Sequence, residues 1–377
     1  MKKLFFVLGI LITSIVYAQN PIQYLFVGTY TNTPAKSEGI YVYKFNPNRA
    51  EATQGSVTKA ENPSFLVVSH DQKFVYAVNE THGDKGGQVS AYALDRSKGT
   101  LTLLNQQPSG GDDPAHIAID SSGKFVIVAN YSGGNISVFK TNADGSLNPA
   151  VQTIAHEGYG VNVQRQEMPH PHCVVFSPDE KFLFCADLGN DRLYRYAFDP
   201  NDATNPLKPT DSAYFVVPDN FGPRHLVFHP NGKVMYLLGE ISGQIIVYSY
   251  NAQDGSVKQI QTIASDNSNT KGDKGSAEID ITKDGRFLYT SNRVTQNDIA
   301  MFKVASDGTL AENGHQPVGP HPRHFMIDPS GRFLLVASRD NNTIQLFIIN
   351  KNFGILQDAN IKIDVPAPVC LKMVPVK

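Results

Sequence analysis

The chain has 377 residues, a formal net charge of −2 and 18% charged residues. This near-neutral charge, with no basic stripe along the sequence, argues against nucleic acid as a partner. Three cysteines are too few for a scaffold built on disulfides. Cys173 and Cys185 lie symmetrically about Asp179 in one predicted hairpin, and the sequence leaves open whether they are bonded or are small core residues.

The first 18 residues have the pattern of a secretory signal peptide. Two lysines follow Met1, residues 4–15 are mostly apolar, and the segment ends in the small residue Ala18. The apolar run is too short to span a bilayer comfortably, and no cysteine follows that could carry a lipid anchor. We therefore expect a cleaved signal peptide at 1–18, a mature domain at 19–377, export to the periplasm or the medium, and no membrane anchor. The alternative is that the apolar run is a buried first strand.

A repeating pattern begins after the signal segment, with a period of about fifty residues. Each copy has a Pro-x-x element, a few apolar residues, a turn like Pro-Asp-Gly, a basic residue and an alternating apolar strand. In four copies glycine occupies the third turn position, which favours a left-handed backbone. The copies start at Pro63, Pro114, Pro171, Pro223, Ser276 and Pro322.

Each repeat predicts four antiparallel strands. The turn joins the first two strands, a third strand follows, and an Asp-Gly or Phe-Gly turn leads to a fourth. The third strands are expected at 89–94, 136–140, 192–198, 245–250, 299–304 and 344–349. Four antiparallel strands form a propeller blade.

The two ends of the chain complement each other. Residues 24–30 and 40–45 have the character of second and third strands without a first, and residues 368–374 form a first strand without a second. Joined, they complete one further blade and leave no open sheet edge. We therefore predict one all-β, seven-bladed β-propeller of four-stranded antiparallel blades, closed by the C-terminal strand.

Charged side chains recur at one end of the predicted ring. The start of each first strand and the end of each second strand lie at the same end of a blade, because the two strands are antiparallel. The first set is Ser64, Ala115, His172, Arg224, Ala277, Arg323 and Val369. The second set is Tyr30, Glu80, Tyr131, Leu188, Glu240, Arg293 and Arg339. These charges either tie neighbouring blades together or form a cationic pocket for an anionic or carbonyl substrate, and their mixture favours the pocket.

A second layer lies one residue deeper. It contains Phe65, His116, Cys173, His225, Glu278, His324 and Cys370. We interpret its three histidines as structural side chains, and we predict no metal because their blades are separated around the ring.

The long connection 156–172 is expected on the charged face, where it carries Arg165 and His170. Long loops on a rigid scaffold often contribute to function. The alternative is a surface insertion without a role.

Three stretches carry a family resemblance. They are Gly222-Pro-Arg-His-Leu-Val-Phe-His-Pro-Asn231, the segment from Ala277 to Tyr289 with Ser291-Asn-Arg293, and Arg165-Gln-Glu-Met-Pro-His-Pro-His172. With them the chain resembles the seven-bladed propeller lactonases, which include propeller-type 6-phosphogluconolactonases and 3-carboxy-cis,cis-muconate lactonizing enzymes. The resemblance covers nearly everything after the signal segment. It implies that His172, Arg224, Glu240 and Arg293 are the catalytic residues, the same four that the ring positions favour.

The resemblance implies hydrolysis of a sugar-acid lactone, like that of 6-phosphogluconolactonase, without a cofactor. We expect His172 or Glu240 to activate water, and the arginines to stabilise the substrate anion or oxyanion. We assign substrate binding to Arg323, Arg339, Glu80, His170 and Arg165. The expected protein is a monomer acting on a small, anionic lactone, and the export signal leaves open whether that lactone is phosphorylated. The alternatives are a lactone-forming cycloisomerase and a non-catalytic binding propeller.

Overall fold

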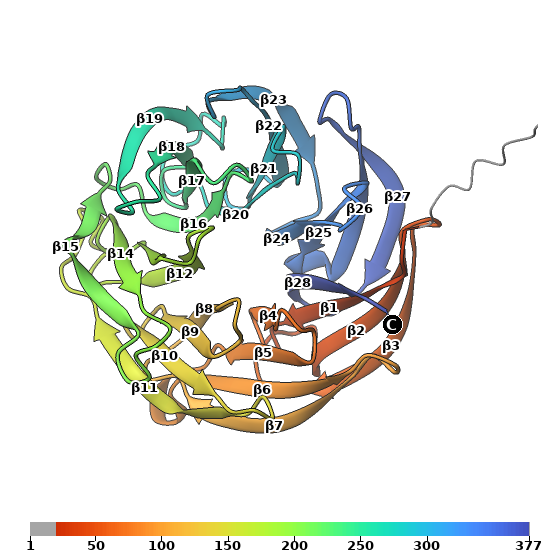
Figure 1. The fold of residues 1–377 in the computed structure, drawn as a ribbon. Coiled ribbons are helices and arrows are strands. Elements are labelled where there is room, and N and C mark those ends of the chain that lie inside the picture. Colours follow the sequence, from red (N-terminus) through yellow and green to blue (C-terminus); the bar gives the residue numbers. More distant parts are fainter. Residues whose placement is uncertain (1–19, 377) are drawn as a thin grey trace, which may run out of the picture.

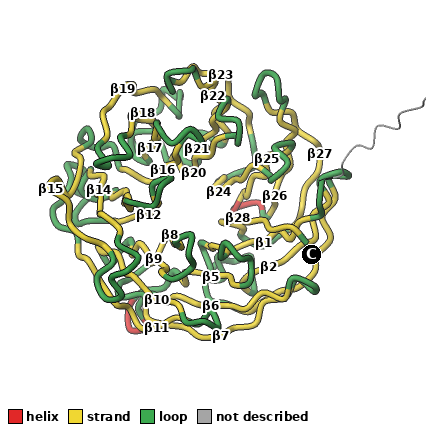
Figure 2. Tube along the Cα trace, viewed as in Figure 1, coloured by secondary structure: helices red, strands yellow, loops and turns green. Residues whose placement is uncertain are grey.

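The computed structural model describes residues 20–376 as seven four-stranded antiparallel sheets arranged in a ring (Figure 1). This confirms the predicted propeller. The predicted signal peptide at 1–18 lies outside the described residues. Within 20–376, the only helices are two short 3₁₀ turns, η1 (Gly83–Lys85) and η2 (Arg339–Asn341), and strands make up almost all regular structure (Figure 2).

The blades are numbered here in chain order, each from the central axis outward. Blade 1 contains β28 (Pro368–Pro375), β1 (Gln23–Thr29), β2 (Gly39–Asn46) and β3 (Glu51–Lys59). Blade 2 contains β4 (Leu66–Val68), β5 (Phe74–Asn79), β6 (Gln88–Asp95) and β7 (Thr100–Pro108). Blade 3 contains β8 (Pro114–Ile119), β9 (Phe125–Asn130), β10 (Asn135–Thr141) and β11 (Leu147–Ala155).

The remaining blades repeat the same order. Blade 4 contains β12 (Pro171–Phe176), β13 (Phe182–Asp187), β14 (Arg192–Phe198) and β15 (Leu207–Val216). Blade 5 contains β16 (Pro223–Phe228), β17 (Val234–Gly239), β18 (Gln244–Tyr250) and β19 (Val257–Ala264). Blade 6 contains β20 (Ser276–Ile281), β21 (Phe287–Asn292), β22 (Asp298–Val304) and β23 (Leu310–Pro317). Blade 7 contains β24 (Pro322–Ile327), β25 (Phe333–Ser338), β26 (Thr343–Ile349) and β27 (Leu356–Asp364).

The ring closes as the sequence predicts. β28 pairs antiparallel with β1, from Gln23 opposite Pro375 to Gly28 opposite Cys370. Figure 1 shows these two strands, from opposite ends of the chain, side by side in blade 1. Each of the two strands supplies the hydrogen-bonding partner that the other lacks.

The core lies between the blades, and this explains why the second strands are almost wholly apolar. In β9, Phe125, Ile127 and Ala129 pack toward blade 4. The alternate residues Val126 and Val128 pack toward blade 2. Because successive side chains of a strand point to opposite faces, a sheet covered on both sides needs apolar residues at every position.

Glycines in the turns between third and fourth strands permit close contact between blades. Gly145 has φ +85°, and a Cβ added there would lie 2.2 Å from Cδ1 of Phe74 in the preceding blade. Its carbonyl accepts a hydrogen bond from the hydroxyl of Tyr76 at 3.0 Å. The same Tyr-to-Gly bond recurs from Tyr236 to Gly308 and from Tyr289 to Gly354, each at 2.9 Å.

A β-bulge interrupts most first strands where they begin, at one end of the ring. Pro171 pairs with Asp187 and Cys173 with Ala186, so His172 is an extra residue between them. Arg224 and Arg323 occupy the same position in blades 5 and 7. A bulge breaks the alternation of a strand and redirects a side chain. The residues at these bulges are Ala115, His172, Arg224, Ala277, Arg323 and Val369.

Candidate active site

Glu240, which follows β17 directly, is buried and surrounded by guanidinium groups. Its Oε1 accepts a hydrogen bond from Nη2 of Arg165 at 2.8 Å. Its Oε2 contacts Nη1 of Arg224 and lies 3.2 Å from Nη2 of Arg293. Burial alone would raise the pKa of the Glu240 carboxyl, but the surrounding positive charges, Arg224 foremost, hold that pKa well below its usual range. Glu240 is therefore a carboxylate at neutral pH.

Arg224 connects Glu240 to His172. Its Nη1 also donates to Nε2 of His172 at 2.7 Å, and its Nε donates to the carbonyl of Ala277 at 2.9 Å. Burial, followed by the charge of Arg224, keeps the pKa of His172 well below its usual range. His172 is therefore neutral, with Nε2 as acceptor and the proton on Nδ1.

Arg293, directly after β21, completes the predicted group of four. Its Nε donates to the carbonyl of Gly275 at 2.9 Å. Burial and the neighbouring charge of Arg224 lower the pKa of Arg293 to about 9. The structure thus joins His172, Arg224, Glu240 and Arg293 in one contiguous cluster across blades 4, 5 and 6.

A second charged group lies at the same mouth. The Tyr30 hydroxyl donates to Oε1 of Glu80 at 2.8 Å, and Arg323 Nη2 lies 3.9 Å from Oε2 of Glu80. The Arg323 guanidinium also lies over the Tyr30 ring, 5.3 Å from its centre. Arg323 and Arg224 line the same small cavity on the axis, so the two groups share one site.

The long loop before β12 reaches over this cluster. Arg165 bridges Glu240 to Asp273, whose Oδ2 lies 2.7 Å from Arg165 Nη1. His170 stacks on Tyr131 with the ring centres 4.4 Å apart, and its backbone amide donates to Asp187. Arg165 therefore belongs to the charged cluster, whereas the contacts of His170 hold the loop against blade 3.

His321 is a site residue that sequence reasoning missed. Its Nε2 lies 3.4 Å from Nη1 of Arg293, and its Nδ1 lies 3.2 Å from Nη2 of Arg339. It thereby joins Arg339, which is paired with Asp340, to the cluster. Burial, with Arg293 and Arg339 next, lowers the pKa of His321 to about 3. The available signal was its place directly before the Pro322 that opens a first strand.

Beneath the charged residues, the deeper layer closes the axis. The His116 ring lies 5.4 Å from the His225 ring and 4.2 Å from the Phe65 ring, centre to centre. The expectation that separate blades keep these histidines apart is therefore wrong, because side chains from different blades converge at the axis. Within residues 20–376 there is no cluster of three or more His, Cys, Asp or Glu side chains arranged to hold a metal ion.

Cys173 and Cys185 are unbonded and buried. Cys173 packs between blades 4 and 5, and Cys185 packs between blades 3 and 4. The two thiols therefore lie on opposite faces of one sheet, which rules out a disulfide in this fold.

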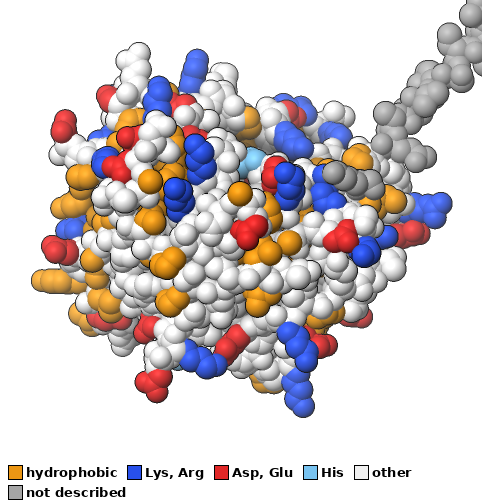
Figure 3. Space-filling view, turned by 60° about the horizontal axis from the view of Figure 1, so that its bottom comes forward, with side chains coloured by type: hydrophobic (Ala, Val, Ile, Leu, Met, Phe, Trp, Pro, Cys, Tyr) orange, Lys and Arg blue, Asp and Glu red, His pale blue; other side chains and the backbone are white. Residues whose placement is uncertain are grey.

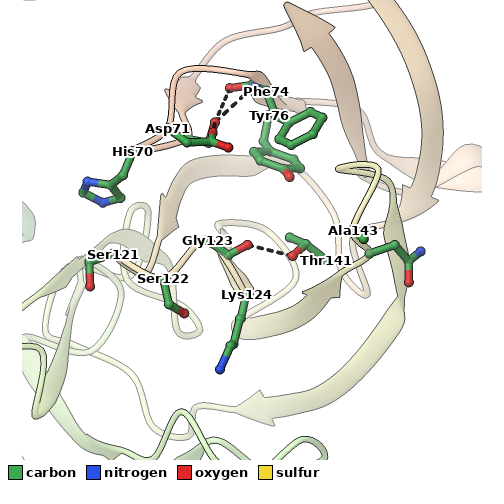
Figure 4. Close-up of a pocket in the computed structure, with 12 residues that line it drawn as sticks. His70, Asp71, Phe74, Tyr76, Ser121, Ser122, Gly123, Lys124, Thr141 and Ala143 are labelled. Atoms are coloured by element: carbon green, nitrogen blue, oxygen red, sulfur yellow. Dashed lines mark hydrogen bonds between the residues drawn. The ribbon is translucent and has the colours of Figure 1, made fainter.

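The site lies at one end of the ring, and a separate pocket lies between the turns at the other. Figure 3 shows Lys and Arg side chains gathered around a visible histidine. The other pocket, of about 340 Å³, is shown in Figure 4. It lies between blades 2 and 3, and some of its lining groups bond to one another, as the Thr141 hydroxyl does to the carbonyl of Gly123 in a neighbouring turn of blade 3. The charged cluster remains the stronger candidate for chemistry.

Comparisons with known proteins agree with this arrangement. The model of the family "Lactonase, 7-bladed beta-propeller" matches residues 24–373. The chain belongs to the seven-bladed β-propeller lactonase family. This lactonase-family chain is 34% identical over 351 residues to the 6-phosphogluconolactonase of Bacillus subtilis, covering 92% of this chain and 97% of the relative.

Two solved structures resemble this chain in both fold and sequence. A Bacteroides fragilis protein described as a candidate 6-phosphogluconolactonase has a TM-score of 0.90 and 42% identity, covering 94% of this chain and 98% of its own. The periplasmic gluconolactonase of Pseudomonas aeruginosa has a TM-score of 0.89 and 34% identity, covering 94% of this chain and all of its own. In the part of the chain described, no helix has the length and apolarity needed to cross a bilayer.

Proposed function

We propose that this protein hydrolyses the lactone of a sugar acid. The observation that carries the proposal is the buried contact chain from His172 through Arg224 to Glu240 and Arg293 at one mouth of the propeller. It combines an imidazole able to accept a proton with cations able to stabilise a carbonyl oxygen. Relatives named as 6-phosphogluconolactonase and gluconolactonase support the same reaction.

The charge of the mouth favours an anionic substrate. Arginine side chains outnumber carboxylates in the cluster, and two of them, Arg224 and Arg293, are almost fully buried. Buried cations without full pairing favour an anionic partner. A carboxylate or phosphate on the lactone would supply that charge, with Arg323 and Arg339 as additional binding groups. Glu80 would hold Arg323 in place.

Arg224 and Arg293 are assigned to the developing oxyanion. When water attacks a lactone, negative charge forms on the carbonyl oxygen, and fixed donors in a water-poor site stabilise it strongly. Both side chains are held through Nε by backbone carbonyls, which leaves their terminal nitrogens facing the cluster. Their orientation therefore costs little at the moment of reaction.

His172 is the better candidate for the base. Arginine groups engage both oxygens of Glu240, whereas Nε2 of His172 has a single hydrogen-bond partner, Arg224. His172 is neutral, and the lone pair of its Nε2 becomes available when Nη1 of Arg224 donates to the substrate oxyanion in place of the imidazole. It takes a proton from the attacking water and returns one to the ring oxygen that leaves. Glu240 then orients the guanidinium groups.

Export is part of the proposal. The predicted signal peptide at 1–18 and the likeness to a periplasmic gluconolactonase support a location outside the cytoplasm. An unphosphorylated sugar lactone, such as gluconolactone, and its 6-phosphate are therefore both candidate substrates.

A substrate panel tests the proposal. Purified residues 19–377 would be assayed by acid release against gluconolactone, its 6-phosphate and a carboxymuconolactone. We expect hydrolysis of at least one sugar lactone, and loss of that activity in a double variant of His172→Ala and Glu240→Gln. Arg286→Ala, an exposed arginine in a turn, is the matched control. Opening of the muconolactone alone would favour the cycloisomerase. Parental hydrolysis by the double variant would exclude this site.

A further inference from the structure

The small cavity on the axis is lined by side chains with unpartnered polar atoms. Four buried atoms without a hydrogen-bond partner belong to its lining: Ser64 Oγ, His172 Nδ1, His225 Nε2 and His324 Nδ1. The accessible volume is about 10 Å³, which suits one water molecule. Buried polar atoms are rarely left unsatisfied, so this set points to a bound molecule.

The protonation of each lining group follows from its other contacts. His172 accepts from Arg224 at Nε2, so its Nδ1 is a donor. His225 Nδ1 lies 3.0 Å from Oε1 of Glu278, so that nitrogen donates and Nε2 is an acceptor.

His324 faces the cavity in the same way. Its Nε2 lies 3.2 Å from Oε2 of Glu278, a buried oxygen that has no hydrogen-bond partner of its own. A proton on Nε2 faces that oxygen favourably, and with the proton there Nδ1 is an acceptor as well. The Ser64 hydroxyl can supply a further donor. The cavity thus offers two donors and two acceptors. A single water molecule, which accepts two hydrogen bonds and donates two, matches this set.

We propose that one water bound by Ser64, His172, His225 and His324 links His172 to Glu278 as a proton relay. The proposal rests on His172 being the base of the proposed lactonase reaction. Glu278 and His225 touch no substrate in this scheme, and they act only by moving the proton that His172 collects.

The surroundings of His172 explain why a relay is useful. A protonated His172 would lie against the fixed cation Arg224, with Arg323 lining the same cavity. Holding a second positive charge there is costly in a buried site. A proton passed on to a carboxylate avoids that cost.

The proton steps balance. As the water oxygen bonds to the carbonyl carbon, its proton goes to Nε2 of His172. His172 releases its Nδ1 proton to the cavity water, which gives one proton to Nε2 of His225. His225 gives its Nδ1 proton to Glu278, which becomes a neutral acid. The reverse sequence returns the proton through His172 to the leaving ring oxygen, and each imidazole keeps its charge.

Other charged groups face the relay. Asp280 lies two residues beyond Glu278 on β20, and burial raises its pKa to about 6. Lys372 lies over the Phe65 ring at 4.8 Å from its centre, and its charge acts on His225 and His324. His116 packs against His225. The pH–rate profiles of two variants can therefore be compared only where both variants keep Asp280, Lys372 and His116.

Three measurements test the relay. A high-resolution crystal structure should show a water within about 3 Å of His172 Nδ1 and His225 Nε2. Glu278→Gln should lower kcat about tenfold to a hundredfold with KM changed by less than about twofold. The solvent deuterium isotope effect on kcat should indicate more than one proton in transfer for the parent protein. For the Glu278→Gln variant it should indicate a single proton. Cys173→Ala, in the same layer, is the matched control.

The outcomes separate the relay from the function on which it rests. If His172→Ala abolishes activity while Glu278→Gln keeps the parental kcat and isotope effect, the relay is wrong and the base assignment stands. If His172→Ala keeps parental activity, His172 is not the base, and the relay that depends on it is wrong as well. The crystal structure does not depend on the folding of a variant, and direct contact between the rings of His172 and His225 without a water would overturn the relay.

Discussion

Arg224 has the largest number of roles of any residue at the mouth. It contacts the carboxylate of Glu240 and the imidazole of His172 with the same Nη1, while Ala277 fixes its Nε. A lysine has one ammonium group and no planar fork, so it cannot reproduce these three contacts together. Charge and geometry at this position can therefore be tested separately.

Arg224→Ala should reduce kcat/KM about 10²–10³-fold, because the site loses an oriented cation where charge develops. Arg224→Lys should recover only a small part of that loss. In the alanine variant the acid limb of the pH–rate profile should move to higher pH, since the charge that helps to depress the pKa of His172 is gone. Steady-state kinetics between pH 4 and 8 measure both effects. An acid limb that stays in place would contradict the assignment of His172.

At the scale of single residues, the sequence predicted the charged ring but not all of its contacts. His172, Arg224, Glu240 and Arg293 could be predicted because the repeat fixes which residues share one end of the ring. Asp273 could not, because it lies in a connection outside the repeat, and the one signal for His321 was its place directly before Pro322. Their contacts depend on how long side chains such as Arg165 and Arg339 extend, and no periodicity describes that.

At the scale of elements, the tight turn of one blade fits against the second strand of the preceding blade. Gly145 shows both requirements at once, a left-handed backbone and too little space for a Cβ beside Phe74. Gly123 also has a left-handed backbone, φ +71°, but a Cβ there would meet nothing within 4 Å. Substituting each glycine in turn therefore distinguishes the cost of backbone strain from the cost of a steric clash.

Gly145→Ala should lower the free energy of unfolding by about 2–4 kcal/mol, from left-handed strain and a clash with a packed ring. Gly123→Ala should cost about 1 kcal/mol, from strain alone. Urea unfolding of both variants compares the two costs. The activity of folded Gly145→Ala should stay near the parental value, because this turn lies at the end of the ring away from the charged mouth. Equal losses of stability in the two variants would contradict the role of crowding.

The strands were predictable and the bulges were not. Alternating apolar residues and Asp-Gly turns gave the strand positions to within a residue or two, as at β14 and β26. A bulge adds one residue without changing composition, so nothing in the sequence separates it from a regular strand. The bulge explains why the consecutive residues Arg224 and His225 both line the axial cavity.

At the scale of the whole molecule, buried neutral histidines make the ring sensitive to acid. Burial lowers the pKa of His324 to about 3, and burial shifts the pKa values of His116, His172 and His225 in the same direction. A histidine whose pKa is lower in the folded than in the unfolded chain binds more protons when the chain unfolds. The free energy of unfolding therefore falls as the pH drops below about 6.5. Asp280, with its raised pKa, acts in the opposite direction but is a single group.

The melting temperature should therefore fall steadily between pH 7 and pH 4. Differential scanning calorimetry in matched buffers measures the slope. His324→Asn should make the slope shallower, because one of the depressed groups is removed. A melting temperature that is constant across this range would show that the axial histidines are not held neutral.

The composite blade also sets the order in which the molecule can be completed. β1 is the first strand of the propeller in chain order, and its inner partner β28 is the last strand of the propeller to be synthesised. Six blades can form locally as the chain emerges, but the ring stays open, with an unpaired β1 edge, until the final residues are available. For a chain that is exported, as we propose, and that folds only after it has crossed the membrane, closure of the ring is the last event on the far side. A molecule cut short by a few residues at its end would reach that compartment with a reactive edge that invites aggregation or degradation.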